Sequence, residues 1–136
     1  MSEPAIFVDA SAFCAILAVE DDAKALLDRL QAAERRMTSP LAIWETVANL
    51  QRLVGRSHEE TERGVQSFMS LMGIAVLSIE PELTTLALDA FRRYGKGRHP
   101  AALNFGDCFA YACAKHHKVP LLCKGNDFVQ TDVEVA

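Results

Sequence analysis

The chain lacks an excess of basic residues. Its 14 Lys and Arg are outnumbered by 18 Asp and Glu, which gives a formal net charge of −4 and an isoelectric point near 5.5. Proteins that coat nucleic acid are usually basic, so the composition argues against a protein of that kind. It does not exclude a nuclease, because metal ions can neutralise an acidic pocket locally.

Paired cysteine motifs are also missing. The four cysteines form no C-x-x-C pair, and none lies near histidine at the spacing of a zinc finger. They are Cys14, Cys108, Cys113 and Cys123. Each has mainly apolar sequence neighbours, so we expect buried, reduced thiols in a cytoplasmic protein.

The chain has no hydrophobic run long enough for a membrane. Residues 68–79, the most apolar part of the longest uncharged stretch, are too few to span a bilayer and include a glycine. Residues 1–4 lack the basic character of a signal peptide, and Asp9 interrupts the apolar segment behind them. We therefore expect no membrane partner.

No linker, repeat or low-complexity segment divides the chain. Its 136 residues, 50% of them hydrophobic, fit one domain with its own core, which we expect to span residues 1–136. Apolar runs typical of strands alternate with helical patterns throughout. This alternation predicts an α/β fold, with a mainly parallel central sheet and helices on both faces.

Individual elements follow from apolar periodicity and from start and stop signals. Strands are expected at 5–8, at 35–38, as buried strands at 75–79 and 119–123, and as a candidate edge strand at 133–135. Helices are expected at 11–19, after Asp21 or Asp22, from Pro40 to Gly55, after a capping box at Ser57 and Glu60, from Pro81 to Gly95, and at 105–117.

Four acidic residues fall where such a sheet binds ligands, beyond the carboxyl ends of its strands. Asp9 ends the first predicted strand, and Asp127 follows the last strong one. Glu45 and Asp107 lie near helix N-termini at the same end. Carboxylates gathered in one cleft repel each other and raise one another's pKa, and divalent cations between them relieve this repulsion.

The four acids together predict a site for hard metal ions, since oxygen-only ligands suit Mg²⁺ or Mn²⁺. One or two such ions can lower the pKa of a bound water and stabilise the charge that develops on a phosphoryl group. We therefore expect hydrolysis of phosphodiester bonds by metal-activated water, without a covalent enzyme intermediate.

Each acid also has a purely structural interpretation. Asp9 could cap the helix that follows it, Glu45 could be a solvated surface residue, and Asp127 could be an ordinary turn residue. Asp107 could interact only with the free N–H groups and the positive dipole end of its helix. The combined pattern is stronger than any single member, but it depends on the predicted fold.

Three further residues are candidates for substrate or supporting contacts. Ser11 could present its hydroxyl to metal or phosphate, and Asn104 could position water or substrate, although both could instead cap helices. Arg98 belongs to a basic run at residues 92–99. Such runs are usually solvated, yet this one adjoins the proposed cleft, where it could contact RNA phosphates.

Four segments carry a family resemblance. They are VDAS at 8–11, Glu45 on the helix begun by Ser-Pro, HPAALNFGDC at 99–108, and LLCKGNDF at 121–128. In this order they resemble PIN-domain ribonucleases, most closely the VapC toxins of bacterial type II toxin–antitoxin pairs, over essentially the whole chain. The first segment is weak alone, whereas the NFGDC and KGNDF segments are much more specific.

The resemblance implies a Mg²⁺- or Mn²⁺-dependent endoribonuclease whose acidic residues are Asp9, Glu45, Asp107 and Asp127. It also implies a homodimer and a structured RNA substrate such as tRNA or ribosomal RNA. A cognate VapB-type antitoxin would silence the enzyme, with its C-terminal segment in the acidic cleft. The fourth acid varies within the family, so Asp132 stays open as an alternative to Asp127.

Two other functions compete with this one. Another Mg²⁺-dependent phosphate-transfer enzyme is disfavoured, because a haloacid-dehalogenase-like phosphatase requires Asp-x-Asp after the first strand, where this chain has Asp9-Ala10-Ser11. A receiver domain requires an Asp after a middle strand, where this chain has Glu80-Pro81. A non-catalytic binding module on a PIN scaffold is not indicated while all four acids are present, and metal binding without RNA cleavage would favour it.

Overall fold

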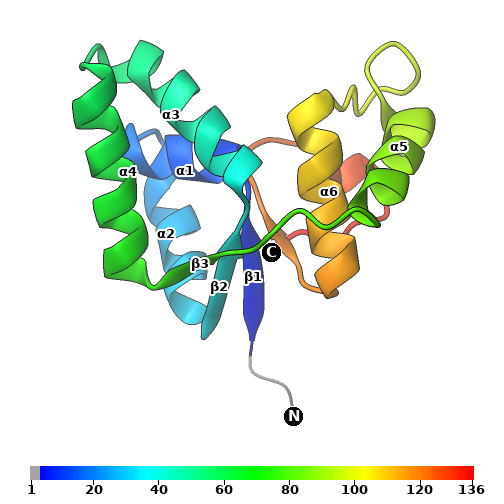
Figure 1. Cartoon of the computed structure of the whole chain (residues 1–136), viewed down its shortest axis with the longest axis horizontal. Coiled ribbons are helices and arrows are strands. Elements are labelled where there is room, and N and C mark those ends of the chain that lie inside the picture. Colours follow the sequence, from blue (N-terminus) through cyan, green and yellow to red (C-terminus); the bar gives the residue numbers. More distant parts are fainter. Residues whose placement is uncertain (1–3) are drawn as a thin grey trace.

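A parallel four-stranded sheet forms the centre of the molecule, with strand order β3-β2-β1-β4 (Figure 1). The computed structural model describes residues 4–136, so residues 1–3 of the segment compared with a signal peptide lie outside it. The strands are β1 (Ala5–Val8), β2 (Arg35–Thr38), β3 (Ile74–Val76) and β4 (Leu121–Leu122). All three strand pairings are parallel, which confirms the predicted α/β class.

Helices connect these strands. In the described part of the chain they are α1 (Ala10–Leu17), α2 (Ala23–Ala32), α3 (Pro40–Val54), α4 (His58–Met72), α5 (Leu83–Tyr94), α6 (Phe105–His117) and the 3₁₀ turn η1 (Phe128–Gln130). The start signal of α3 acts as expected, because the Ser39 hydroxyl accepts a hydrogen bond from the Ala42 N–H. Its stop signal is Gly55, whose φ of +66° lies in the left-handed region that favours glycine.

The sheet separates two hydrophobic clusters, as the alternation of side chains along a strand requires. In β1, Phe7 joins the cluster that includes buried residues of α5 and α6. Its neighbours Ile6 and Val8 join the cluster that includes residues of α1, α2, α3 and α4. Helices therefore cover both faces of the sheet, as predicted, and Figure 1 shows the two groups on opposite sides of β1.

The predicted buried strand at 75–79 is wrong in extent and environment. Strand β3 covers Ile74–Val76 at the edge of the sheet, and 49% of Val76 is exposed. Beyond it the chain leaves the sheet after one more hydrogen bond, from the Leu77 N–H to the Thr38 carbonyl (2.8 Å). The apolar residues Leu77 and Ile79 pack against the α5–α6 cluster as a loop. Their hydrophobicity reflects this burial and not strand pairing.

Two predicted strands near the C-terminus are also shorter than expected. The run at 119–123 pairs with β1 only through Leu121–Leu122. The candidate edge strand at 133–135 is reduced to one isolated bridge between Leu121 and Val135. Both segments are buried in part. Their apolar residues therefore reflect side-chain burial and not long strand pairing.

Other expectations can be compared directly with residues 4–136. All four cysteines are free and buried, as predicted. Asp22 precedes α2, but its side chain makes no capping hydrogen bond. Instead its carboxylate lies 3.7 Å from the Lys124 ammonium. No helix in this part of the chain is long and apolar enough to cross a membrane.

Candidate active site

Asp9 lies at the junction of β1 and α1 and is only 4% exposed. Its Oδ2 accepts hydrogen bonds from the backbone N–H (3.1 Å) and the hydroxyl of Ser11. Asp9 is therefore the N-cap of α1, as its structural interpretation predicted. A role as a metal ligand is compatible with this cap, because both hydrogen bonds from Ser11 go to the same carboxylate oxygen. Burial raises the pKa of Asp9, and the bonds from Ser11 oppose that rise.

Ser11 also connects this corner to the loop after β4. Its hydroxyl oxygen accepts a hydrogen bond from the Lys124 backbone N–H (3.0 Å). The Lys124 ammonium in turn pairs with Glu20, 3.2 Å away. The Ser11 hydroxyl thus fixes Asp9 and the β4 loop relative to each other.

Asp107 is held by a reciprocal cap at the start of α6. Its backbone N–H donates to Asn104 Oδ1 (2.9 Å), and its Oδ2 accepts from the Asn104 N–H (3.0 Å). The capping alternative for Asn104 is therefore the one found. Burial raises the pKa of Asp107 to about 6. The hydrogen bond from the Asn104 N–H lowers this pKa, and the charges of Asp9 and Asp127 raise it further.

Glu45 reaches the first turn of α6 from the neighbouring helix α3. Its carboxylate lies so close to Gly106 that a Cβ atom at position 106 would overlap it. Burial, followed by the charges of Asp9 and Asp107, raises the pKa of Glu45 to about 7. Residues from β1, α3 and α6 are thus brought within electrostatic reach of one another.

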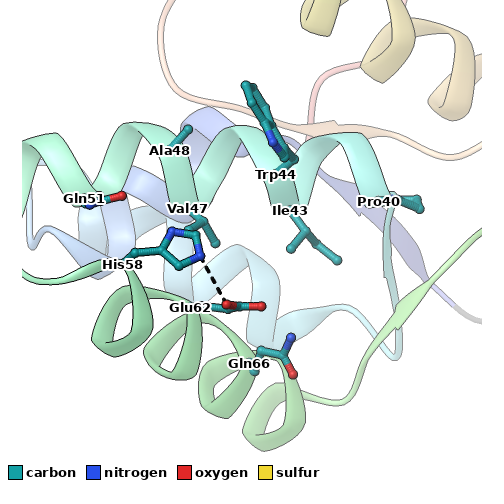
Figure 2. A pocket seen from close by; sticks show the side chains of 9 residues that line it. All are labelled: Pro40, Ile43, Trp44, Val47, Ala48, Gln51, His58, Glu62 and Gln66. Atoms are coloured by element: carbon teal, nitrogen blue, oxygen red, sulfur yellow. Dashed lines mark ion pairs between the residues drawn. The ribbon is translucent and has the colours of Figure 1, made fainter.

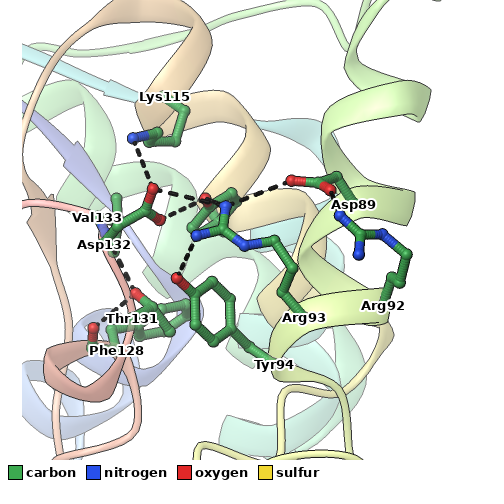
Figure 3. Close-up of polar contacts among 10 residues, drawn as sticks. Asp89, Arg92, Arg93, Tyr94, Lys115, Phe128, Thr131, Asp132 and Val133 are labelled. Atoms are coloured by element: carbon green, nitrogen blue, oxygen red, sulfur yellow. Dashed lines mark hydrogen bonds and ion pairs between the residues drawn. The ribbon is translucent and has the colours of Figure 1, made fainter.

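Asp127 and Asp132 have different surroundings. Asp127 precedes η1, and its charge contributes to the raised pKa of Asp107. Asp132 accepts a hydrogen bond from the Tyr111 hydroxyl and lies 3.3 Å from the Lys115 ammonium and 3.6 Å from the Arg93 guanidinium (Figure 3). Its negative charge is therefore balanced by these two basic side chains, and Asp132 is not among the charges that raise the pKa values of Glu45 and Asp107.

Most of the basic run at 92–99 makes structural contacts. Arg92 and Arg93 pair with Asp89 at 2.6 Å and 3.4 Å. The guanidinium of Arg98 lies 4.9 Å from the centre of the Phe91 ring. The Arg98 side chain is thus placed by a cation–π contact with α5 and remains exposed.

The thiols near the acids do not fit a role as ligands or nucleophiles. Burial, together with Asp9 and other nearby acids, raises the pKa of Cys14 to about 11 and that of Cys123 to about 12. Both remain protonated at neutral pH, whereas the thiolate is the form that binds metals and attacks electrophiles.

The carboxylates fit a hard divalent cation in their chemistry. All donors are oxygen, and no Lys or Arg within residues 4–136 forms an ion pair with Asp9, Glu45 or Asp107. A cation would relieve the repulsion that raises their pKa values. No three His, Cys, Asp or Glu side chains in that range converge closely enough to hold an ion as they stand, so binding would have to draw the carboxylates together.

Two contributors to this arrangement were not identified from the sequence. Gly106 could have been noticed as a glycine inside a helix beside a candidate acid, since helices disfavour glycine. Lys124 contributes through its backbone N–H, and no side-chain pattern could indicate that contact.

Sequence comparisons all relate this chain to one family of proteins. The PIN domain family matches residues 6–134. A VapC ribonuclease of Rhizobium meliloti (strain 1021) is 42% identical over 139 residues, covering 93% of this chain and 98% of that relative. A ribonuclease VapC of Mycolicibacterium smegmatis is 38% identical over 126 residues, covering 93% and 95%.

Solved structures share the fold. The crystal structure of Mycobacterium tuberculosis VapC20, a sarcin–ricin loop cleaving toxin, matches with a TM-score of 0.74 and 20% identity, covering 96% of this chain and 98% of that one. A chain of a toxin–antitoxin complex from Klebsiella pneumoniae matches with a TM-score of 0.69 and 16% identity, covering 96% of each chain. The protein belongs to the PIN domain family, and within it to the VapC ribonucleases.

Proposed function

We propose that this VapC ribonuclease is a metal-dependent endoribonuclease whose ligands for Mg²⁺ or Mn²⁺ are Asp9, Glu45, Asp107 and Asp127. The observation that supports this most is that one buried and two half-buried carboxylates, those of Asp9, Glu45 and Asp107, come together from different parts of the fold, with Glu45 against the first turn of α6 and no Lys or Arg of residues 4–136 ion-paired to them. The raised pKa values of the three acids agree with this arrangement. A divalent cation bound there supplies an activated water and stabilises charge on the phosphoryl group.

The chain's own contribution is to orient these carboxylates. The Ser11 hydroxyl holds Asp9 Oδ2 and leaves the other oxygen available to a ligand. The Asn104 N–H does the same for Asp107. Arg98, exposed at the N-terminal side of the α6 helix, is proposed to contact RNA phosphates, because backbone contacts depend mainly on charge.

The partners follow from the family. We propose that the substrate is a structured RNA, that the enzyme works in the cytoplasm as a homodimer, and that a VapB-type antitoxin inhibits it by placing its C-terminal segment at the acids. A similarly folded chain occurs in a toxin–antitoxin complex from Klebsiella pneumoniae, which supports an antitoxin as a partner.

Cleavage of total bacterial RNA by the purified, antitoxin-free protein tests the enzymatic part. Discrete cuts are expected with Mg²⁺ or Mn²⁺ and should vanish with EDTA or in the Asp107→Asn variant. Cuts that persist in both controls would indicate a contaminating nuclease or a different active site. Metal binding without any cleavage would favour the non-catalytic binding module.

A further inference from the structure

Trp44 is an exposed aromatic side chain directly before Glu45. It is the only tryptophan of the chain, and 69% of it is exposed. Its neighbours Ile43 and Val47 belong to the cluster that holds α3 and α4 together. Figure 2 shows the indole on the opposite side of α3 from His58 and Glu62 of α4. The fold therefore presents this ring outward instead of using it in the core.

The indole face is unused within residues 4–136. Other aromatic rings there have ring partners, as in the Phe13–Phe68 and Phe105–Phe109 pairs. Arg98 covers Phe91. No aromatic ring or cation of the described residues stacks on Trp44.

The ring precedes Glu45 directly in the sequence and lines one pocket together with Ile43 and Val47 of α3 (Figure 2). The Glu45 carboxylate contacts Gly106, so the residue before Glu45 borders the place where α3 meets α6. The other large, exposed hydrophobic residues of α3 are Leu53 and Val54, more than two helical turns away. A ring whose face carries no stacked group within residues 4–136 can accept one planar group at this position.

An RNA strand brings planar groups to this position. If its scissile phosphate lies at the carboxylates, which include Glu45, the bases of the flanking nucleotides pass the part of α3 on which the neighbouring Trp44 is exposed. Unpaired bases can leave their stack and lie on an aromatic ring, and stacking of this kind tolerates any base identity. Bases in a duplex are already stacked and paired, so they offer no free face.

We propose that Trp44 stacks on an unpaired base next to the phosphodiester at the acidic site, an inference that rests on the proposed ribonuclease function. Duplex stems would not use this contact.

The single tryptophan allows a direct test that does not need catalysis. In the Asp107→Asn variant, fluorescence of Trp44 is followed while a randomised single-stranded 12-nucleotide RNA, or a duplex of equal length, is added. We expect the single strand to quench the emission and to shield the ring from acrylamide, and the duplex to do neither. The double variant Asp107→Asn/Trp44→Ala should bind the single strand about tenfold more weakly, whereas Trp44→Phe should retain most of the affinity.

Matched controls separate the possible failures. Leu71→Ala changes another exposed hydrophobic residue, 82% exposed on α4, and should leave RNA affinity unchanged. Binding of RNA without a change in Trp44 emission, or with full affinity in Trp44→Ala, would overturn the stacking proposal and leave the ribonuclease function intact. Full RNA affinity of Trp44→Ala, together with loss of antitoxin binding by this variant, would show that the ring contacts a protein instead. Absence of any RNA binding by Asp107→Asn, together with absence of any cleavage of total RNA by the wild type, would overturn both proposals.

Discussion

At the scale of single residues, Gly106 determines how closely Glu45 can approach the start of α6. A glycine inside a helix normally costs up to about 1 kcal/mol relative to alanine. At position 106 the added methyl group would overlap the Glu45 carboxylate, which is the far end of a flexible side chain and can move away. Gly106→Ala should therefore reduce RNA cleavage by about tenfold or more while changing the free energy of unfolding by less than about 1 kcal/mol.

Gly64 provides the matched control for this substitution. It lies in α4, and a Cβ atom there would meet nothing within 4 Å. Gly64→Ala should raise stability by up to about 1 kcal/mol and leave cleavage unchanged. Chemical denaturation and a cleavage assay on both variants give the comparison. Normal cleavage by Gly106→Ala would show that the position of Glu45 against α6 is unimportant.

Asp132 gives a prediction about acid stability. Burial raises the pKa of Asp132, but the hydrogen bond from Tyr111 and the charges of Lys115 and Arg93 lower it by more (Figure 3). The pKa of Asp132 therefore lies below its ordinary value. A lowered folded-state pKa means that the ionised carboxylate stabilises the fold above about pH 4, and that this contribution is lost as the pH falls through the lowered value. Asp132→Asn should cost about 1 kcal/mol at pH 7, since the group is half-exposed.

Urea denaturation at two pH values measures this effect. The difference in unfolding free energy between wild type and Asp132→Asn should shrink at about pH 3, because below the ordinary pKa of about 3.9 the unfolded chain takes up a proton at Asp132 and the contribution of the ionised carboxylate is being lost. Tyr111→Phe removes the same hydrogen bond and should show the same trend. A difference that is equal at both pH values would mean that the ionic contacts of Asp132 contribute nothing.

At the scale of elements, the cap of α6 couples helix stability to the position of an acid. Asn104→Ala removes the acceptor of the Asp107 N–H and should cost about 1 kcal/mol of stability. It should also weaken binding of Mn²⁺, because the first turn that carries Asp107 loosens. Ser57→Ala removes the corresponding cap of α4 at similar cost but should leave Mn²⁺ affinity unchanged. Calorimetric titration with Mn²⁺ distinguishes the two, and equal affinities in both variants would uncouple the cap from the metal.

Elements also show what could and could not be predicted from the sequence. Helix starts such as Ser39-Pro40 use side chains that bond to their own backbone, so they are local signals and the helix was predicted correctly. Strand β3 was misjudged because an apolar run signals burial, and the run after Val76 is buried as a loop. The four acids were predicted as a set from their places at element ends, and their role as metal ligands stays a prediction. The Glu45–Gly106 contact depends on how two distant helices pack, and no local pattern encodes it.

At the scale of the whole molecule, repulsion between acids acts across three parts of the fold. Asp9 lies between β1 and α1, Glu45 lies in α3 and Asp107 lies in α6. Burial and the charges of nearby acids raise the pKa values of Glu45 and Asp107. The ionised native state is therefore less stable without a cation than with one. An ion that binds only the folded protein should stabilise it by about 2.7 kcal/mol at one hundred times its dissociation constant.

Thermal unfolding with Mn²⁺ and with EDTA tests this linkage and the identity of the fourth acid together. For a chain of this size we expect Mn²⁺ to raise the melting temperature of wild type by about 5–10 °C. Asp107→Asn should lose most of the rise, and Asp127→Asn should lose part of it. Asp132→Asn should keep the full rise, because the Asp132 carboxylate is already neutralised by Lys115 and Arg93. If Asp132→Asn loses the rise in melting temperature and Asp127→Asn keeps it, the fourth ligand has been assigned to the wrong residue. An equal rise in melting temperature in all variants would place the ion elsewhere.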